Sequence, residues 1–378
     1  MSAIQVLLVA GELGLGGGIE RDVSKYARHL SGHGISPHVA CFRPGGHRWQ
    51  EIENAGVPVL PLEVSSFKSR SAFHAAGELR SYIRLNRIQV VHSFDDASNF
   101  LGSIVARASR VPVVLTSQLC FRELSSTKNR VMLAFSDRLA KGVFVNCHAV
   151  AKDLSTKWRI PKDKIFVCHN GFEPEEFNPN DRGRIPELAD ASIVVGTVCM
   201  LREEKNIPCL VTAFSELAKI DSKARLLIVG SGVMKGQLER LVEDLSIRSS
   251  CLFLDSTSRP ADYMQSIDIF VVPSRSEAFP NALLEAMACG CCPVASRVGG
   301  IPELIGQNER GVLFKSGDAQ ELAATLICLA RDPKQRKTLA SDAAAYAIEN
   351  LSIDKATARL ASIYRELLMR NSVSEFRG

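Results

Sequence analysis

Residues 273–288 read PSRSEAFPNALLEAMA and join an expected strand, Ile267–Val272, to an expected helix. Pro280 suits the first turn of that helix, because the N–H that proline lacks has no intrahelical partner there. The backbone N–H groups of Asn281 and Ala282 would then point towards the carboxyl end of the strand. Such groups can bind hydroxyls or phosphate. The segment therefore predicts a ligand site where the strand meets the helix.

Two carboxylates belong to the same segment. Glu277 lies just before the helix, and Glu285 lies about two turns along it. Carboxylates accept hydrogen bonds from neighbouring hydroxyl groups, which sugars and riboses carry. The alternative for a pair of glutamates taken alone is a solvated helix face.

Strands and helices alternate along both halves of the chain. This order predicts two doubly wound parallel sheets, an α/β architecture of two Rossmann-like domains. A polar stretch with three prolines, residues 170–190, is interpreted as a linker. The expected domains are 1–175 and 176–355, with a helix at 356–378 that packs back toward the first domain. The expected strands are Ile4–Ala10, Ser36–Cys41, Val57–Leu62, Gln89–Ser93, Pro112–Thr116, Gly142–Asn146, Lys164–Cys168, Ser192–Cys199, Ala224–Val229, Cys251–Leu254, Ile267–Val272, Cys292–Ala295 and Gly311–Phe314.

The composition excludes several classes of protein. The chain has 378 residues, of which 46% are apolar and 23% charged, as in ordinary globular proteins. No uncharged apolar run approaches the ~18 residues of a membrane-spanning helix. The N-terminus lacks a basic start and is expected to be a buried strand rather than a signal peptide. The net charge is +5, but no dense basic block with aromatic residues is present, so no nucleic-acid partner is expected.

The 11 cysteines are an odd number and lie mostly in apolar stretches, which favours packing in a reducing cytosol over a disulfide framework. The cluster Cys289-Gly290-Cys291-Cys292 lacks a second Cys/His pair at zinc spacing. We therefore expect these thiols to pack and expect no metal site.

A glycine-rich loop, residues 11–21, follows the first expected strand. Glycines allow close approach of the backbone to an anion, and the helix that follows would direct its positive end at that anion. The loop is not a dinucleotide fingerprint, because Ile19 occupies the place of the last glycine. It also lacks the Lys-Ser/Thr of a phosphate-binding P-loop. A tight turn with no ligand is the alternative.

Segment 273–288 resembles the E-x7-E segment of the retaining GT-B glycosyltransferases of family 4. The resemblance continues at 290–296 and 299–304, reaches back to 195–197 and 202–206, and is looser in the first half. There it rests on the Gly-Gly-x-Glu-Arg loop, on Val90–Ser93 and on Asn170–Phe172. It implies the GT-B fold, in which two Rossmann-like domains face each other across a cleft and a C-terminal helix crosses back to the first domain.

The resemblance also implies roles for the second half. Glu277 would contact the hydroxyls of the donor sugar, and Glu285 those of the ribose. Arg202 and Lys205 would neutralise the leaving diphosphate, so that neither a metal nor a cofactor is needed. The expected donor-binding residues are Gly17, Gly18, Arg202, Lys205, Glu277, Phe279, Asn281, Ala282 and Glu285.

The first half is expected to bind the acceptor through Gly16, Asp95 and Gln118. Many relatives carry a histidine where this chain has Gln118, and glutamine cannot act as a base. His92 ends an expected strand and is the candidate catalytic residue of this half, beside Arg202, Lys205 and Glu277. A histidine with only a structural role is the alternative.

The expected function is transfer of a sugar, with retention, from a nucleoside diphosphate sugar, UDP-linked, to a hydroxyl of a glycan or lipid-linked acceptor. Cell-surface polysaccharide or glycolipid synthesis in the cytoplasm, at the inner face of the membrane, is the expected setting. The basic segment Lys128–Lys141 would either touch lipid or face the core. The alternatives are a nucleotide-sugar epimerase of the same fold and a non-catalytic nucleotide-sugar-binding partner subunit.

Overall fold

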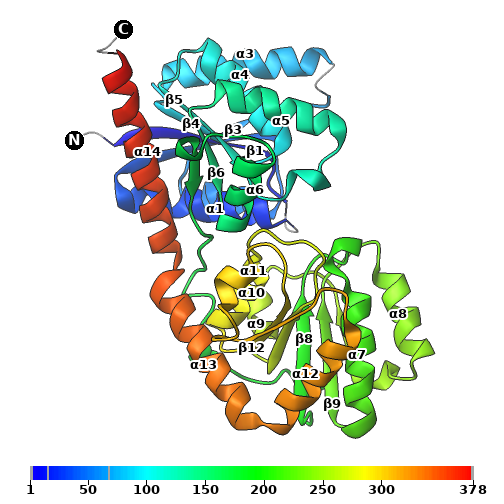
Figure 1. The fold of residues 1–378 in the computed structure, drawn as a ribbon. Helices are drawn as coiled ribbons and strands as arrows, with labels where there is room; N and C mark the ends of the chain where they lie inside the picture. The colour runs from blue at the N-terminus through cyan, green and yellow to red at the C-terminus, as the bar shows by residue number, and fades with distance from the viewer. Residues whose placement is uncertain (1–2, 15–16, 67–68, 376–378) are drawn as a thin grey trace. The chain divides into compact units, whose positions relative to one another are not determined.

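The computed structural model describes residues 3–14, 17–66 and 69–375. The chain divides into two compact units (Figure 1). The N-terminal unit contains residues 1–171 and 353–378, and the C-terminal unit contains residues 172–352. Each unit is built on a parallel sheet with helices on both faces, which is the open α/β architecture that the sequence predicts.

In the described residues, the sheet of the N-terminal unit has seven parallel strands in the order β3-β2-β1-β4-β5-β6-β7. Its strands are β1 (Ile4–Glu12), β2 (Ile35–Arg43), β3 (Val59–Pro61), β4 (Val90–Ser93), β5 (Val113–Gln118), β6 (Gly142–Val145) and β7 (Ile165–Val167). Its helices are α1 (Gly18–His29), α2 (His47–Asn54), α3 (Arg70–Leu85), α4 (Asp96–Ala108), α5 (Thr127–Leu139), α6 (His148–Thr156) and α14 (Ile353–Glu375).

Strand β1 is buried on both faces, because successive side chains of a strand point to opposite sides of its sheet. Leu7 and Val9 pack with residues of α3 and α4 on one face. Val6 and Leu8 pack on the other face with residues of α1 and α14. This burial explains why the strand reads as a continuous apolar run.

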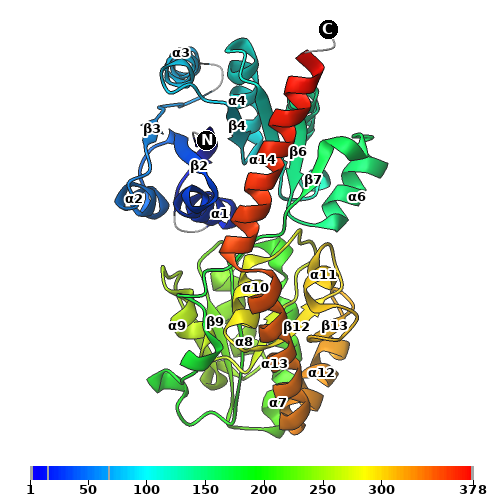
Figure 2. The ribbon, with the colours of Figure 1, turned by 90° about the vertical axis from the view of Figure 1, so that its left-hand side faces the viewer.

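The C-terminal helix α14 belongs to the N-terminal unit, although 181 residues of the other unit precede it. It lies beside α1 on one face of the sheet (Figure 2). Leu360, Ile363 and Tyr364 are fully buried in the core of that face. The helix therefore forms part of the fold of this unit.

In the described residues, the sheet of the C-terminal unit has six parallel strands in the order β10-β9-β8-β11-β12-β13. Its strands are β8 (Ile193–Val198), β9 (Ala224–Val229), β10 (Cys251–Leu254), β11 (Ile269–Val272), β12 (Cys292–Ser296) and β13 (Val312–Phe314). Its helices are α7 (Ile207–Ile220), α8 (Lys235–Asp244), α9 (Pro260–Met264), α10 (Asn281–Ala288), α11 (Ile301–Ile305), α12 (Ala319–Arg331) and α13 (Pro333–Asn350).

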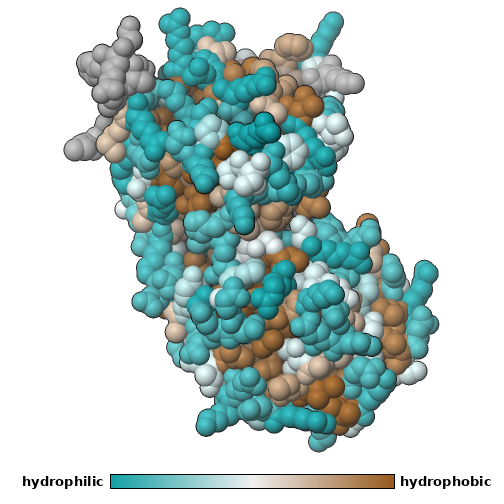
Figure 3. All heavy atoms as spheres, in the orientation of Figure 1, coloured by the Kyte–Doolittle hydropathy of each residue, from teal (hydrophilic) through white to brown (hydrophobic). Residues whose placement is uncertain are grey.

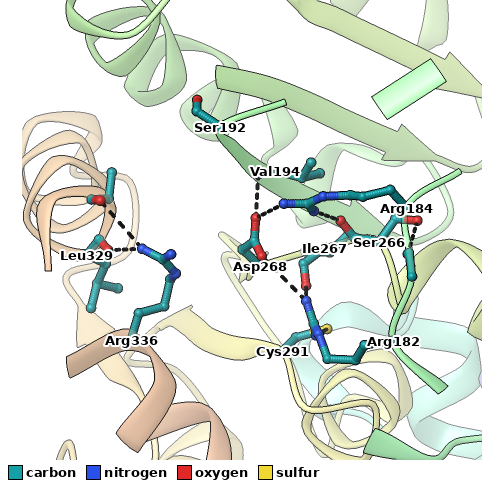
Figure 4. A network of polar contacts seen from close by, with 12 residues as sticks. Arg182, Arg184, Ser192, Val194, Ser266, Ile267, Asp268, Cys291, Leu329 and Arg336 are labelled. Carbon is teal, nitrogen blue, oxygen red and sulfur yellow. Dashed lines mark hydrogen bonds and ion pairs between the residues drawn. The ribbon is translucent and has the colours of Figure 1, made fainter. Parts of the chain in front are cut away.

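Two arginines fasten the first part of the C-terminal unit to its sheet (Figure 4). Arg182 donates to the carbonyl oxygen of Ile267 over 2.7 Å, and Arg184 forms an ion pair of 2.6 Å with Asp268. Asp268 also accepts a hydrogen bond from the backbone N–H of Val194. The polar stretch that reads as a linker is thus bound to this unit from Arg182 onward.

The cysteines at the end of α10 are core residues. Cys289, Cys291 and Cys292 are fully buried, and all three thiols are free. Burial raises the pKa of the Cys291 thiol to about 11, and this thiol donates to the carbonyl oxygen of Met264. Protonated thiols in this setting behave as small apolar side chains.

Hydrophilic residues cover most of the surface visible in Figure 3, with hydrophobic patches between them. Searched over the described ranges, the chain has no helix with the length and apolar character needed to span a bilayer.

Candidate active site

The central feature of the C-terminal unit is an ion pair between Lys205 and Glu277. The Lys205 Nζ atom lies 2.6 Å from the Glu277 Oε1 atom. Lys205 ends a short 3₁₀ helix, Glu203–Lys205, just after β8, and Glu277 lies between β11 and α10. β8 and β11 are neighbours in a parallel sheet, so their carboxyl ends meet at one edge. The structure thus brings together two predicted site residues that are far apart in the sequence.

The two loops that carry this ion pair are also joined by other contacts. The backbone N–H of Arg275 donates to the carbonyl oxygen of Glu204 over 2.8 Å. The side-chain amide of Asn206 donates to the carbonyl oxygen of Pro273. Asn206 has φ 51°, a left-handed conformation that asparagine tolerates better than most residues. These contacts fix the backbone on both sides of Lys205 and just before Glu277.

The ion pair with Glu277 keeps Lys205 in its positively charged form. Burial alone would lower the pKa of its ammonium, but the charge of Glu277 and the hydrogen bond to it outweigh burial and raise that pKa. The side chains of Lys205 and Glu277 are 24% and 11% exposed, so both can still reach a ligand. Of the three N–H groups of the ammonium, Glu277 occupies one in the described structure. The others can bind an anion.

Helix α10 starts at this edge of the sheet, as the sequence predicts. Pro280 precedes its first residue in an extended conformation, and Asn281 and Ala282 form a partly exposed first turn. The positive end of the helix dipole is therefore accessible to an anion. Gly290, with φ 73°, lies in the left-handed conformation that commonly ends a helix.

The remaining predicted donor residues differ in exposure. Phe279 is 4% exposed and Glu285 is 2% exposed. Arg202 is exposed, and its side chain makes no ion pair or hydrogen bond with the described residues. Lys205 is therefore the cation of this loop that the structure holds in place.

Two hollows of about 420 Å³ each open in the N-terminal unit. They share Ile19, Asp95, Ala97 and Lys128, and they lie where β1, β2, β4 and β5 end. The first hollow is also lined by Phe94, Asp96, Ser117, Gln118, Leu119, Cys120, Asn129 and Met132. The second is also lined by Gly11, Glu12, Glu20, Phe42, Arg43, Val64, Ser65 and Ser66.

Asp95 lies between the two hollows and holds the glycine-rich loop. Its carboxylate accepts a hydrogen bond of 2.6 Å from the N–H of Gly11 and caps α4 through the N–H of Ser98. Burial raises the pKa of the Asp95 carboxyl, although its hydrogen bonds to Ser98 and Gly11 oppose this shift. A side chain at Gly11 would crowd this carboxylate, because a Cβ atom there would lie 3.2 Å from it.

Gln118 lies at the end of β5 and lines the first hollow. Its amide group donates to the carbonyl oxygen of Cys120 over 2.9 Å, and its oxygen accepts from Arg122 over 2.8 Å. Arg122 is buried and forms an ion pair with Asp137. Arg122 is not among the residues that the sequence motifs single out; its place four residues after Gln118 is the one signal for it in the sequence.

The structure describes only part of the glycine-rich loop, residues 11–21. The acceptor candidate Gly16 lies outside the described residues. Gly17 has φ −103° and caps α1, and Gly18 is the first residue of that helix. The structure thus places both glycines at the N-terminus of α1, beside Ile19, which lines both hollows.

His92 lies in the core of the N-terminal unit. It is 0% exposed, and its ring nitrogens form hydrogen bonds of 2.8 Å with the hydroxyls of Tyr364 and Ser117. Burial lowers the pKa of its imidazole from 6.5 to about 3. A catalytic group must reach the reacting atoms, so this placement favours the structural alternative, and we assign His92 no catalytic role.

Replacing His92 by glutamine should flatten the acid side of the pH dependence of stability. The unfolded chain binds a proton at this residue near pH 6.5, whereas the folded unit binds it only near pH 3. Between these values, His92 lowers the free energy of unfolding by about 1.4 kcal/mol for each unit of falling pH. Trp49 and Trp158, the two tryptophans of the chain, both lie in the N-terminal unit. Their fluorescence during urea unfolding at pH 7 and pH 5 reports that unit.

The matched control for this experiment is His74→Gln, because the side chain of His74 is 75% exposed. This variant should keep the wild-type dependence on pH. An equally steep loss of stability in His92→Gln would contradict the assignment of a neutral, structural His92.

Comparison with known proteins agrees with this geometry. The sequence profile of the family described as Glycosyl transferases group 1 matches residues 183–346, and that of Glycosyltransferase Family 4 matches residues 16–176. The chain is a glycosyltransferase of GT-B fold. It belongs to the group 1, family 4 glycosyltransferases.

Three known proteins illustrate the range of similarity. N-acetyl-alpha-D-glucosaminyl L-malate synthase of Bacillus anthracis is 29% identical over 55% of this chain, a match that spans about half (55%) of the relative's length. N-acetylgalactosamine-N,N'-diacetylbacillosaminyl-diphospho-undecaprenol 4-alpha-N-acetylgalactosaminyltransferase of Campylobacter jejuni is 24% identical over 79% of this chain and 78% of its own. The crystal structure of Alr3699/HepE of Anabaena in complex with UDP and glucose superimposes with a TM-score of 0.83 at 21% identity, covering 96% of this chain and 100% of that one.

Proposed function

We propose that this glycosyltransferase moves a sugar, with retention of configuration, from a UDP-sugar to a hydroxyl of a glycan or lipid-linked acceptor. The observation that carries the proposal is the Lys205–Glu277 pair at the carboxyl edge of the C-terminal sheet. It combines a carboxylate suited to sugar hydroxyls with a cation suited to a diphosphate. The superimposed Anabaena structure, which holds UDP and glucose, supports the choice of nucleotide.

In this proposal the donor binds around the ion pair. Lys205 and Arg202 bind the diphosphate, beside the N-terminus of α10, and Glu277 accepts from the sugar. Glu285 binds the ribose. Negative charge grows on the diphosphate as the glycosidic bond breaks, so fixed cations there stabilise the transition state. The departing phosphate takes the proton of the attacking hydroxyl, and no carboxylate nucleophile is assigned.

The two hollows of the N-terminal unit are the proposed acceptor site. Asp95, Asp96 and Asn129 supply groups that bind hydroxyls, and the hollows also have apolar walls that suit the faces of sugar rings. The name of the Campylobacter jejuni relative includes a diphospho-undecaprenol acceptor, which supports a lipid-linked acceptor in polysaccharide or glycolipid synthesis.

A membrane surface is the proposed place of action. Leu124, Val131 and Phe135 are exposed apolar residues on α5 or just before it, and the exposed Lys128 and Arg138 lie on the same helix. Apolar side chains among basic residues suit an anionic lipid surface.

The proposal predicts slow hydrolysis of the donor in the absence of acceptor. Incubation with UDP-glucose, UDP-N-acetylglucosamine, GDP-mannose and ADP-glucose, followed by ¹H NMR, should show one UDP-sugar releasing the α-anomer first. EDTA should leave the rate unchanged, because Lys205 and Arg202 provide the positive charge. Release of the β-anomer first would contradict retention of configuration. A large fall in the hydrolysis rate with EDTA would contradict metal independence. Conversion of the donor into its epimer would favour the epimerase alternative.

A further inference from the structure

Glu277 has two carboxylate oxygens in different situations. Its Oε1 atom accepts from Lys205 over 2.6 Å and from the hydroxyl of Ser274 over 2.8 Å. A carboxylate oxygen offers two lone-pair sites, so these two donors saturate it. No described residue donates a hydrogen bond to the Oε2 atom.

Ser274 is more deeply buried than the carboxylate that it contacts. It is 1% exposed, and its carbonyl oxygen accepts from the hydroxyls of Ser296 over 2.6 Å and Ser316 over 3.1 Å. Ser274 follows β11, Ser296 ends β12 and Ser316 follows β13, and these three strands are neighbours in the sheet. The three serines therefore link the carboxyl ends of three strands, and Ser274 connects them to Glu277.

We infer that Ser274 is a positioning residue that fixes the Oε1 atom of Glu277. This leaves the Oε2 atom to accept hydrogen bonds from the donor sugar. The inference rests on the proposed function, in which Glu277 binds that sugar. Ser274 does not touch the sugar and acts through Glu277. The sugar is then recognised through the Oε2 atom alone. Two neighbouring hydroxyls of the sugar cannot each donate to a different oxygen of this carboxylate.

The test compares Ser274→Ala with Ser276→Ala. Ser276 lies on the same loop, and no described residue forms a hydrogen bond with its side chain. The substrate is the nucleotide sugar that binds the wild type best among UDP-glucose, UDP-N-acetylglucosamine, GDP-mannose and ADP-glucose. The first assay measures its hydrolysis without acceptor, and the second measures binding of the matching nucleoside diphosphate by calorimetry. Ser274→Ala should lower kcat about 10-fold, the size expected for one hydrogen bond to a charged group. It should leave the affinity for the nucleoside diphosphate unchanged. Ser276→Ala should behave as the wild type.

A double-mutant cycle separates positioning from general structural support. In a Glu277→Ala background, Ser274→Ala should cause no further loss of kcat, because Ser274 acts only through Glu277. An equal loss in both backgrounds, or a parallel loss of nucleoside diphosphate affinity, would overturn the inference and leave the proposed function standing. A wild type that binds none of the four nucleotide sugars would overturn the proposed function and this inference with it.

Discussion

Lys205→Ala is expected to lower turnover of the nucleotide sugar about 100-fold or more, the usual size of losing one group that stabilises transition-state charge. The substitution removes the cation that the structure holds beside Glu277, and it also leaves that carboxylate without its ion-pair partner. The loss should appear mainly in kcat, because charge on the leaving diphosphate grows as the bond breaks. Release of nucleoside diphosphate in a coupled assay measures it.

Lys219→Ala is the matched control for this prediction. Lys219 lies on α7 of the same unit and forms an ion pair of 2.7 Å with Glu216, but its side chain is 66% exposed. Exposed pairs of this kind contribute little to stability. Turnover should therefore be unchanged, and a Lys205→Ala enzyme with wild-type turnover would show that the diphosphate is neutralised elsewhere.

Glu277→Gln is expected to lower kcat/KM for the nucleotide sugar about 100-fold, since a partly buried charged acceptor and its ion pair are lost together. Glutamine keeps the shape of the side chain but carries no charge to hold Lys205. Affinity for the nucleoside diphosphate alone should change far less, because that ligand lacks the sugar. Steady-state kinetics with the sugar and calorimetry with the nucleoside diphosphate separate the two effects.

Glu216→Gln provides the control, because it removes the same charge from the exposed pair on α7. It should leave both measurements unchanged. A Glu277→Gln enzyme that loses affinity for the sugar donor and for the nucleoside diphosphate equally would place Glu277 against the nucleotide instead.

The elements that carry the proposed donor site could be predicted from the sequence because they are short and contiguous. Segment 273–288 carries Glu277, the start of α10 and Glu285 in one piece, and the structure places α10 at Asn281–Ala288. The pairing with Lys205 joins residues 72 positions apart. No period in the sequence reveals such a contact, and only the family resemblance linked the two loops.

The surroundings of the proposed acceptor site were harder to predict because its residues come from many separate segments. The strand pattern places His92 at a strand end but does not indicate which residues bury its side chain. The partner that buries it, Tyr364, lies 272 residues away on α14. Similarly, the side chain of Gln118 is held by a hydrogen bond from Arg122, and Arg122 in turn forms an ion pair with Asp137. Contacts of this kind arise from tertiary packing, which a single sequence does not encode in any local signal.

Element boundaries show the same limit on a smaller scale. The expected strand Val57–Leu62 is shorter in the structure, where β3 spans Val59–Pro61. After the first strand, the sequence pattern predicts an amphipathic helix over Ile19–Gly32; in the structure the α-helix ends at His29 and continues as a 3₁₀ turn. In contrast, the sequence pattern also predicts a helix over Ala319–Arg331, and α12 has these bounds in the structure, where Asp318 caps its start with two hydrogen bonds.

The most direct test of the central claim is calorimetric titration of the wild type and of Glu277→Ala with UDP-glucose, UDP-N-acetylglucosamine, GDP-mannose and ADP-glucose. We expect the wild type to bind one UDP-sugar more tightly than the other three donors. We also expect Glu277→Ala to lose this preference while it still binds UDP. Absence of binding by the wild type to all four, or equal binding of the preferred sugar by Glu277→Ala, would contradict the proposed donor site.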